Sequence, residues 1–169
     1  MRSNLGSLLL IRFQRQGNTQ DLDEAIATLR DALSSLSVAY PDRPISLYNL
    51  AGALSVRFRY LSNDQDLDEA ITLHGEALAL RPSGHPDQAE SLIDLANVLS
   101  TRFECRGNDL DLDQMIALHR EALTLHPVGH PDRSRSLKRL GYALSTRFEH
   151  RGNDQDLDEA VTRHGEALA

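Results

Sequence analysis

Acidic turns are the first feature of this sequence that could do chemistry, because their spacing matches the start of a calcium-binding loop. Asp64, Asp66 and Asp68 read D-x-D-x-D. Such a loop needs glycine at its sixth position and glutamate at its twelfth, but Glu69 and Gly75 stand there. We therefore expect these acids to stabilise the start of a helix, and we expect no metal site and no cofactor.

Three histidines form a second candidate set, because they share one spacing. His74, His119 and His164 are 45 residues apart and lie on the apolar stripe of a predicted helix. Equivalent residues of stacked helix pairs lie about 10 Å apart, whereas a shared zinc ion needs ligands at about 2 Å. We expect each ring to pack in the core with one hydrogen bond and to give the protein a response to pH. The tripeptide His-Pro-Asp at 85–87 and 130–132 also recurs at one phase, and turn chemistry explains it.

Cys105 is the single cysteine and a weak candidate nucleophile. Its counterparts at 45-residue spacing include Tyr60 and His150, so the pattern does not require a thiol, and no fixed histidine partner accompanies it. Serine-triad, phosphate-loop and dinucleotide signatures are absent from the sequence. We expect no catalytic residue and no enzyme. A lone cysteine cannot form an internal disulfide, which favours a reducing, cytoplasmic location.

These residues recur because the 169-residue chain repeats itself every 45 residues without a gap. Arginine followed by phenylalanine marks one phase of the repeat, and asparagine marks another. The sets are Arg12, Arg57, Arg102 and Arg147; Phe13, Phe58, Phe103 and Phe148; and Asn18, Asn63, Asn108 and Asn153. We expect each arginine to reach acids in the following turn, for example Arg57 to Asp64 or Asp66.

Each copy contains two helical stretches that position these side chains. The first stripe of the second copy consists of Leu47, Leu50, Ala51 and Leu54. Gly107 is predicted to end the first helix of the third copy, and Ser62 stands at that place in the second. The second helix is predicted to begin at Asp66, with Asp66 as N-cap and Glu69 reaching back to it in a capping box.

No alternating β-rich run interrupts this pattern, so we predict an all-α protein of about eight helices. A single helix pair cannot bury both of its faces, and neighbouring pairs must therefore stack into a solenoid. We predict one solenoid domain over 1–169, cut from a longer array. Its approximate repeats are 1–41, 42–86, 87–131 and 132–169.

The repeat resembles the tetratricopeptide (TPR) motif, extended from 34 to 45 residues. In the second copy the matching positions are Leu47, Leu50, Ala51, Leu54, Ala70, His74, Ala77 and Pro82. The His-Pro-Asp joint is similar to that of the long repeats of kinesin light chain. The Arg-Gly-Asn-Asp phrase at 151–154 resembles fungal TPR arrays, which often precede a caspase-like CHAT domain. The resemblance implies a right-handed α-solenoid.

The resemblance also implies a binding surface, because the first helices of TPR solenoids line a concave groove. The matching positions here are Tyr48, Asn49, Gly52, Ile93, Asp94, Asn97, Thr101, Arg135, Lys138, Arg139 and Tyr142. Asn49 and Asn97 could bind the backbone of an extended peptide, and Arg135, Lys138 and Arg139 could bind a carboxylate. The Lys and Asn order of the known carboxylate clamp is missing, so C-terminal chaperone tails are not the expected ligand.

The function that this pattern predicts is a non-catalytic scaffold whose groove binds a protein or peptide segment. A net charge of −7 disfavours nucleic acid as a partner, and no apolar run reaches the roughly 20 residues of a membrane span. One alternative is a structural or regulatory spacer attached to a separate effector domain, such as a CHAT-type domain, with no ligand of its own. Others are a homo-oligomer that assembles through uncapped solenoid ends and, more weakly, a piece of an enzyme.

Overall fold

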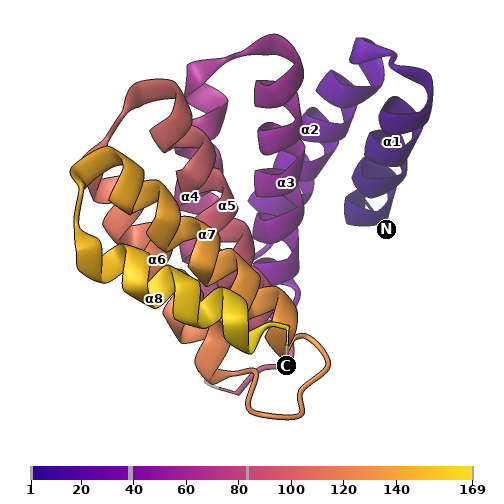
Figure 1. Cartoon of the computed structure of the whole chain (residues 1–169). Helices are drawn as coiled ribbons and strands as arrows, with labels where there is room; N and C mark the ends of the chain where they lie inside the picture. The colour runs from indigo at the N-terminus through magenta and orange to yellow at the C-terminus, as the bar shows by residue number, and fades with distance from the viewer. Residues whose placement is uncertain (1, 38–39, 83, 169) are drawn as a thin grey trace. The chain divides into compact units, whose positions relative to one another are not determined.

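The computed structural model describes residues 2–37, 40–82 and 84–168, and these residues form eight α-helices and no strand (Figure 1). The helices are α1 (Arg2–Gln16), α2 (Thr19–Ser34), α3 (Arg43–Leu61), α4 (Asp64–Ala79), α5 (Gln88–Arg106), α6 (Asp109–Thr124), α7 (Arg133–Arg151) and α8 (Asp154–Glu166). The all-α prediction and the expected number of helices are confirmed. Within the described ranges, no helix is both long and apolar enough to cross a membrane.

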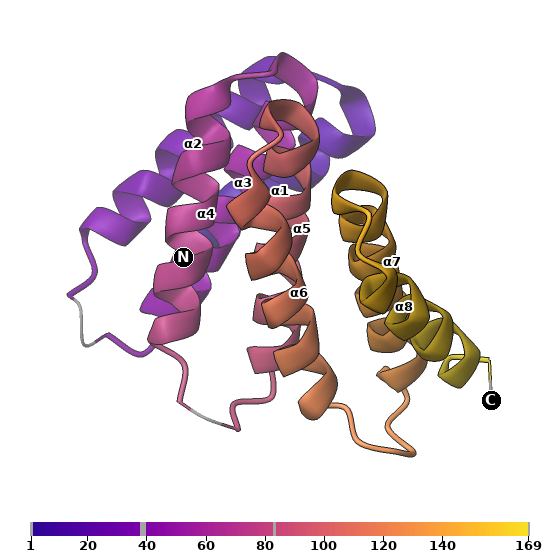
Figure 2. The ribbon, with the colours of Figure 1, turned by 60° about the vertical axis from the view of Figure 1, so that its left-hand side comes forward.

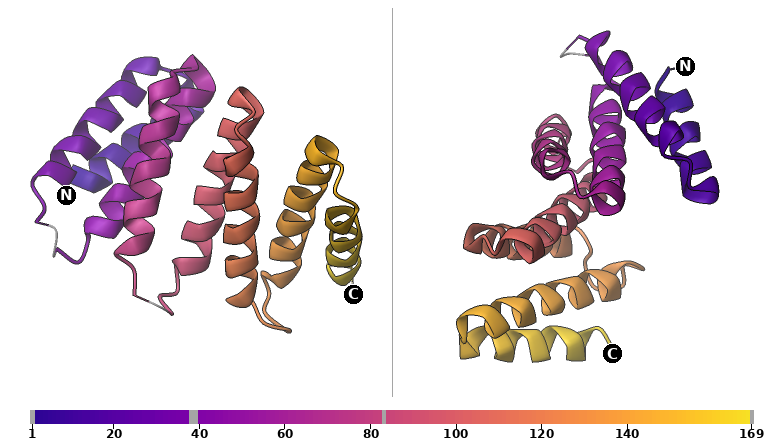
Figure 3. Two further views of the ribbon diagram at one scale, coloured as in Figure 1. Left: turned by 90° about the vertical axis from the view of Figure 1, so that its left-hand side faces the viewer. Right: turned by 90° about the horizontal axis from the view of Figure 1, so that it is seen from above.

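Consecutive helices pair into hairpins, α1 with α2, α3 with α4, α5 with α6 and α7 with α8. The hairpins belong to two compact units, unit 1 (Met1–Pro82) and unit 2 (Ser83–Ala169). In unit 1 α2 packs against α3, and in unit 2 α6 packs against α7 (Figures 2 and 3). Each unit therefore contains two hairpins in the helix–turn–helix order of a TPR-like repeat. A single solenoid over 1–169, with the repeat boundaries given above, stays a prediction.

The ends of the helices follow the polar and glycine positions of the repeat. Asn63 is the N-cap of α4, where its side chain accepts a hydrogen bond from the backbone N–H of Gln65. Asn18, Asn108 and Asn153 have the same role. The predicted cap at Asp66 is wrong, because α4 has already begun at Asp64 and the side chain of Asp66 is buried elsewhere. Ser62 adopts a φ of 53° after α3, the left-handed conformation that glycine supplies after α1, α5 and α7.

Leucine and alanine fill the core of each hairpin, as the scarcity of aromatic residues requires. The predicted stripe of α3 is confirmed, since Leu47, Leu50, Ala51 and Leu54 are each at most 2% exposed. His74 and His119 are buried as expected, but His164 is exposed. α8 is the last helix of the described chain, and no further helix covers the side of α8 that carries His164.

An ion pair with a buried carboxylate joins the two helices of every hairpin. Arg57 donates from Nε and Nη2 to both carboxylate oxygens of Asp66, each at 2.7 Å. The same two-point pair forms in the other three hairpins, between Arg12 and Asp21, Arg102 and Asp111, and Arg147 and Asp156, at 2.5–2.9 Å. The arginines thus reach the following turn as predicted. Hydrogen bonding to the guanidinium lowers the pKa of Asp21 and of Asp156.

The same arginines also connect neighbouring hairpins within a unit. In unit 1 the Nη1 atom of Arg57 donates to Asp23 of α2 at 3.2 Å, and in unit 2 that of Arg147 donates to Asp113 of α6 at 2.8 Å. A second pair joins the second helices of the two hairpins of each unit, Arg30 of α2 with Glu69 of α4 in unit 1 and Arg120 of α6 with Glu159 of α8 in unit 2, each at 2.5 Å. Ionic contacts therefore recur with the repeat both inside and between hairpins.

Candidate functional site

A pocket of about 540 Å³ lies in unit 2, lined by α5, α6, the α6–α7 joint and α7. Most of its lining residues come from positions that vary between copies of the 45-residue repeat, whereas Ser100, His119 and Pro131 stand at recurring positions. They are Asn97, Ser100, Met115, His119, Pro131, Ser134, Arg135, Lys138, Arg139 and Tyr142. The first helices of two successive hairpins thus supply most of the walls, as in the groove that the TPR resemblance implies.

The second helix of the first hairpin contributes the buried part of the pocket. Met115 and His119 are one helical turn apart on α6, and they are 1% and 5% exposed. Burial, helped by the positive charge of Arg139, lowers the pKa of His119 from 6.5 to about 4. The imidazole is therefore neutral at neutral pH. Its Nδ1 atom is buried and has no hydrogen-bond partner among the described residues.

Three cationic side chains of α7 line the pocket above this buried histidine. Arg139 donates from Nη1 to the Oδ1 atom of Asn97 at 2.8 Å, but its Nε atom is buried without a partner among the described residues. Arg135 donates to Glu90 of α5 at 3.2 Å. Lys138 is exposed, as is Tyr142 at 56%. The pocket thus combines positive charge, unsatisfied polar atoms and an aromatic surface, which suits an anionic or hydrogen-bonding ligand.

The structure brings five of the predicted groove residues together in this pocket, namely Asn97, Arg135, Lys138, Arg139 and Tyr142. Asp94 and Thr101 lie next to them and contact Asn97, at 3.5 Å from its side-chain amide and at 3.1 Å from its carbonyl oxygen. The predicted place of Ile93 needs correction, because its side chain is 0% exposed and offers no surface to a partner. α5 is packed closely at that point, since Leu92 and Ala96 beside it are equally buried.

The remaining predicted residues, Tyr48, Asn49 and Gly52, lie on α3 of unit 1. Tyr48 is half-buried, meets the ring of His74 edge-on at 5.4 Å, and has the guanidinium of Arg81 5.5 Å from its ring centre. Asn49 is half-buried as well. Gly52 has open space where a side chain would start. These residues form no part of the unit 2 pocket.

Sequence reasoning missed the pocket's contributions from α6 and from the joint. His119 was expected only to pack in the core, and Met115, Pro131 and Ser134 were not considered as lining residues. The 45-residue spacing alone could not tell whether a buried side chain is completely covered by its neighbours or forms the floor of a pocket. A usable signal was present in the differences between copies, since Leu29 stands where the three later copies carry His74, His119 and His164.

Within each unit the fold is that of a TPR-like helical repeat. No family model matches the chain, and no curated protein matches it. Three solved structures show similar folds. "DHF58 filament" matches with a TM-score of 0.59 and 19% identity over 99% of this chain and 90% of that one. The designed helical repeat protein DHR64 matches with a TM-score of 0.55 and 18% identity over 99% and 90%. MamA protein matches with a TM-score of 0.60 and 19% identity over 98% and 72%.

Proposed function

We propose that the chain is a non-catalytic scaffold and that the unit 2 pocket binds an acidic, extended segment of a protein partner. The observation that carries this proposal is the set of three cations of α7 around a pocket with buried, unpartnered polar atoms. The chain as a whole is acidic at −7, so this concentration of positive charge is a local departure from the rest of the surface. Desolvated arginine binds carboxylates through paired, charge-assisted hydrogen bonds.

The neutral state of His119 supports the same ligand class. An uncharged imidazole can donate or accept a hydrogen bond, and its buried Nδ1 atom gains a partner when a peptide amide or carbonyl fills the pocket. Asn97, whose Oδ1 atom already accepts from Arg139, also presents an amide to a peptide backbone. Specificity for the acidic side chains and contact with the backbone would thus come from different residues of one pocket.

Peptide binding measured by fluorescence polarisation tests this proposal. Labelled peptides with a central acidic pair are compared with matched amide versions, against the native chain and the Lys138→Glu variant. We expect acidic peptides to bind the native chain and Lys138→Glu to weaken their binding at least tenfold, with a loss of affinity at higher salt. Arg59→Glu, an equal change of charge on an exposed residue of α3, is the matched control and should leave binding unchanged.

Two outcomes would contradict the proposal: equal binding of acidic and amide peptides, or an equal effect of the two variants. Failure of every peptide to bind would instead favour a spacer without a ligand. Light scattering of the same samples at rising concentration examines the remaining alternative, self-association. That alternative draws support from exposed apolar residues on the first and last helices, such as Leu8 at 62% and Val161 at 66%.

A further inference from the structure

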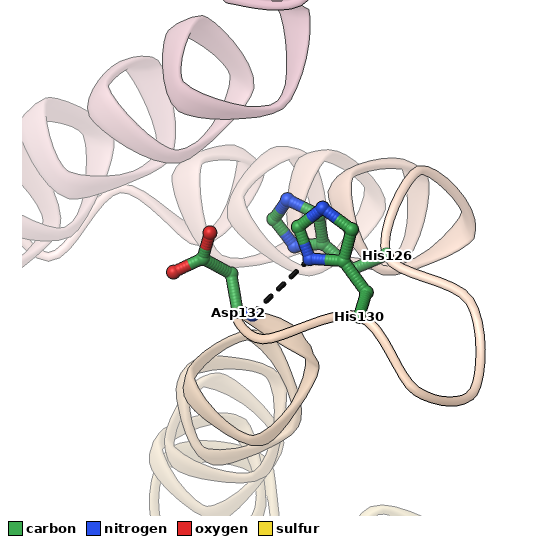
Figure 4. Close-up of side chains that lie close together, drawn as sticks. All are labelled: His126, His130 and Asp132. Atoms are coloured by element: carbon green, nitrogen blue, oxygen red, sulfur yellow. Dashed lines mark hydrogen bonds between the residues drawn. The ribbon is translucent and has the colours of Figure 1, made fainter.

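The joint between α6 and α7 gathers two histidines and an aspartate outside the pocket contacts described above. Potential ligand atoms of His126, His130 and Asp132 all lie within 4.8 Å of one another (Figure 4). Imidazole nitrogen with carboxylate oxygen is a donor set that binds zinc and other divalent transition metals, whereas calcium and magnesium prefer oxygen alone.

The two imidazole rings are already held in place by the fold. They stack with their centres 4.3 Å apart and their planes inclined by 20°. His126 is only 6% exposed, and its Nδ1 atom lies 2.7 Å from the Oγ atom of Ser136 on α7. When Nδ1 donates its proton to that hydroxyl, Nε2 presents a free lone pair. A hydrogen bond of this kind from the second ring nitrogen is the usual way in which proteins orient a metal-binding histidine.

His130 and Asp132 are half-buried and lie in and beside the turn, where small movements suffice to complete a site. A metal at the centre of three atoms 4.8 Å apart would lie about 2.8 Å from each, roughly 0.7 Å beyond a zinc–nitrogen bond. The Nδ1 atom of His130 accepts a 3.1 Å hydrogen bond from the backbone N–H of Asp132. Ligation by His130 gives up this one contact, because the ring must change tautomer or offer Nδ1 itself to the metal.

The charges around the cluster permit a cation. The carboxylate of Asp132 is 3.2 Å from Arg135, and the same Arg135 nitrogen lies 3.2 Å from Glu90. If Asp132 turns to a metal ion, Arg135 keeps Glu90 as its partner. The positive charge of the ion therefore replaces that of Arg135 at Asp132 without leaving the arginine unpaired.

Comparison with the other His-Pro-Asp joint of the chain shows which residues are needed for the turn and which are left as candidate metal ligands. His85 and Asp87 make the same turn, with the Nδ1 atom of His85 accepting from the backbone N–H of Asp87 at 3.1 Å. The residue at the position of His126 in that joint is Arg81. The tripeptide thus explains the turn in both copies, and the extra imidazole is found in one. Repeat spacing could not reveal this set, because His126 has no histidine counterpart 45 residues away.

We propose that His126, His130 and Asp132 bind one divalent transition-metal ion such as Zn²⁺. Three protein ligands leave a coordination position open for water or for a side chain of a bound partner. The ion would fix the joint that precedes α7, the helix that carries the three pocket cations. The proposal does not depend on the proposed peptide ligand, because its test measures metal binding alone.

Calorimetric titration with ZnCl₂ tests the proposal on the full chain carrying Cys105→Ser, which removes an exposed thiol that could bind zinc. We expect one zinc ion per chain, and we expect His130→Ala to abolish binding while His85→Ala, at the matching joint, leaves it unchanged. Asp132→Asn, which retains a side chain able to cap α7, should weaken binding at least tenfold. Circular dichroism checks that each variant is folded, and visible absorption of the Co²⁺ form reports a site of low coordination number.

Three results would overturn the proposal. The first is no zinc binding by the parent chain in excess ZnCl₂. The second is the same stoichiometry and affinity in His130→Ala as in the parent. The third is an equal loss in His130→Ala and His85→Ala, which would mean that neither joint is the specific site.

Discussion

Units 1 and 2 share one skeleton but differ in the surface that they present. The same ion pair forms inside each unit at corresponding positions, Arg57 with Asp66 in unit 1 and Arg147 with Asp156 in unit 2. By contrast, the pocket histidine His119 corresponds to Leu29, and Lys138 corresponds to Tyr48. The repeat thus specifies how a hairpin folds, whereas the positions that vary between copies decide what the surface can bind.

Leu29 and His119 occupy corresponding positions of the two units and are buried to a similar degree, but their side chains differ in hydrogen-bonding capacity. Leu29 is 0% exposed and His119 5%, so both fill a buried place in the second helix of a hairpin. The leucine side chain has no polar atom that needs a hydrogen bond. The histidine brings one, Nδ1, that lacks a partner among the described residues. One substitution within an unchanged packing pattern thereby places an imidazole in the first hairpin of unit 2 where the first hairpin of unit 1 has a leucine.

Leucine-to-alanine changes at matched core positions should show that the skeletons are equivalent. Leu22 and Leu112 are 90 residues apart and each is 0% exposed. Truncation of either should lower the free energy of unfolding by about 2–5 kcal/mol, because it leaves a cavity in a packed core. Urea unfolding followed by circular dichroism measures both losses. A loss at one position that exceeds the other by more than about 2 kcal/mol would break the comparison.

The pH dependence of stability should report on the buried histidine of the unit 2 pocket. His119 has a folded pKa of about 4, whereas an unfolded histidine has a pKa near 6.5. Between these values the unfolded chain binds a proton that the folded chain does not, so stability falls as the pH drops from 6.5 to 4. The cost reaches at most about 3 kcal/mol and is complete below pH 4.

His119→Leu, which installs the unit 1 residue in unit 2, is the variant for this measurement. Subtraction of its unfolding free energies from those of the native chain at each pH removes the contribution of the aspartates. The difference should fall with falling pH, and only between 6.5 and 4. A flat difference would show that His119 is not buried in its neutral form.

Arginine-to-alanine changes should have a smaller effect that is again the same in both units. Arg57→Ala and Arg147→Ala each leave a buried carboxylate without its two strongest hydrogen bonds. We expect each to cost about 2 kcal/mol, because charged hydrogen-bonded pairs are expensive to break but these guanidinium groups retain some contact with solvent. Thermal unfolding at low and high salt gives the value. A loss below a few tenths of a kcal/mol would assign the arginines to the surface alone.

Most of the fold could be predicted from the sequence, because each helix carries its own periodic stripe and its own stop signal. Leu47 to Leu54 marked α3 through spacing alone, and glycine or Ser62 marked helix ends. The cap at Asp66 was predicted wrongly for a physical reason. Asparagine and aspartate both cap helices, and the expected pairing of Arg57 with Asp64 or Asp66 did not decide which polar residue of the turn starts α4.

Only part of the candidate site, the side chains of its walls, could be predicted from the sequence. Its walls followed from positions on the first helices, so Asn97, Arg139 and Tyr142 were found in advance. Its floor depended on how closely α7 approaches α6, a distance that no single helix encodes. Whether His119 touches a cavity or a neighbouring side chain is decided by packing between hairpins, and the exposure of His164 follows from the same cause.

The placement of the arginine pairs has a consequence for how the array responds to salt and to strain. Inside a hairpin the carboxylate partner is almost completely shielded, as Asp66 is at 3% exposure, whereas the partner across the hairpin boundary in unit 1, Asp23, is 62% exposed. Dissolved ions can weaken the second kind of contact far more than the first. Each hairpin is therefore a stiff segment, and the seam between hairpins within a unit is the more compliant element, with a stiffness that ionic strength can adjust.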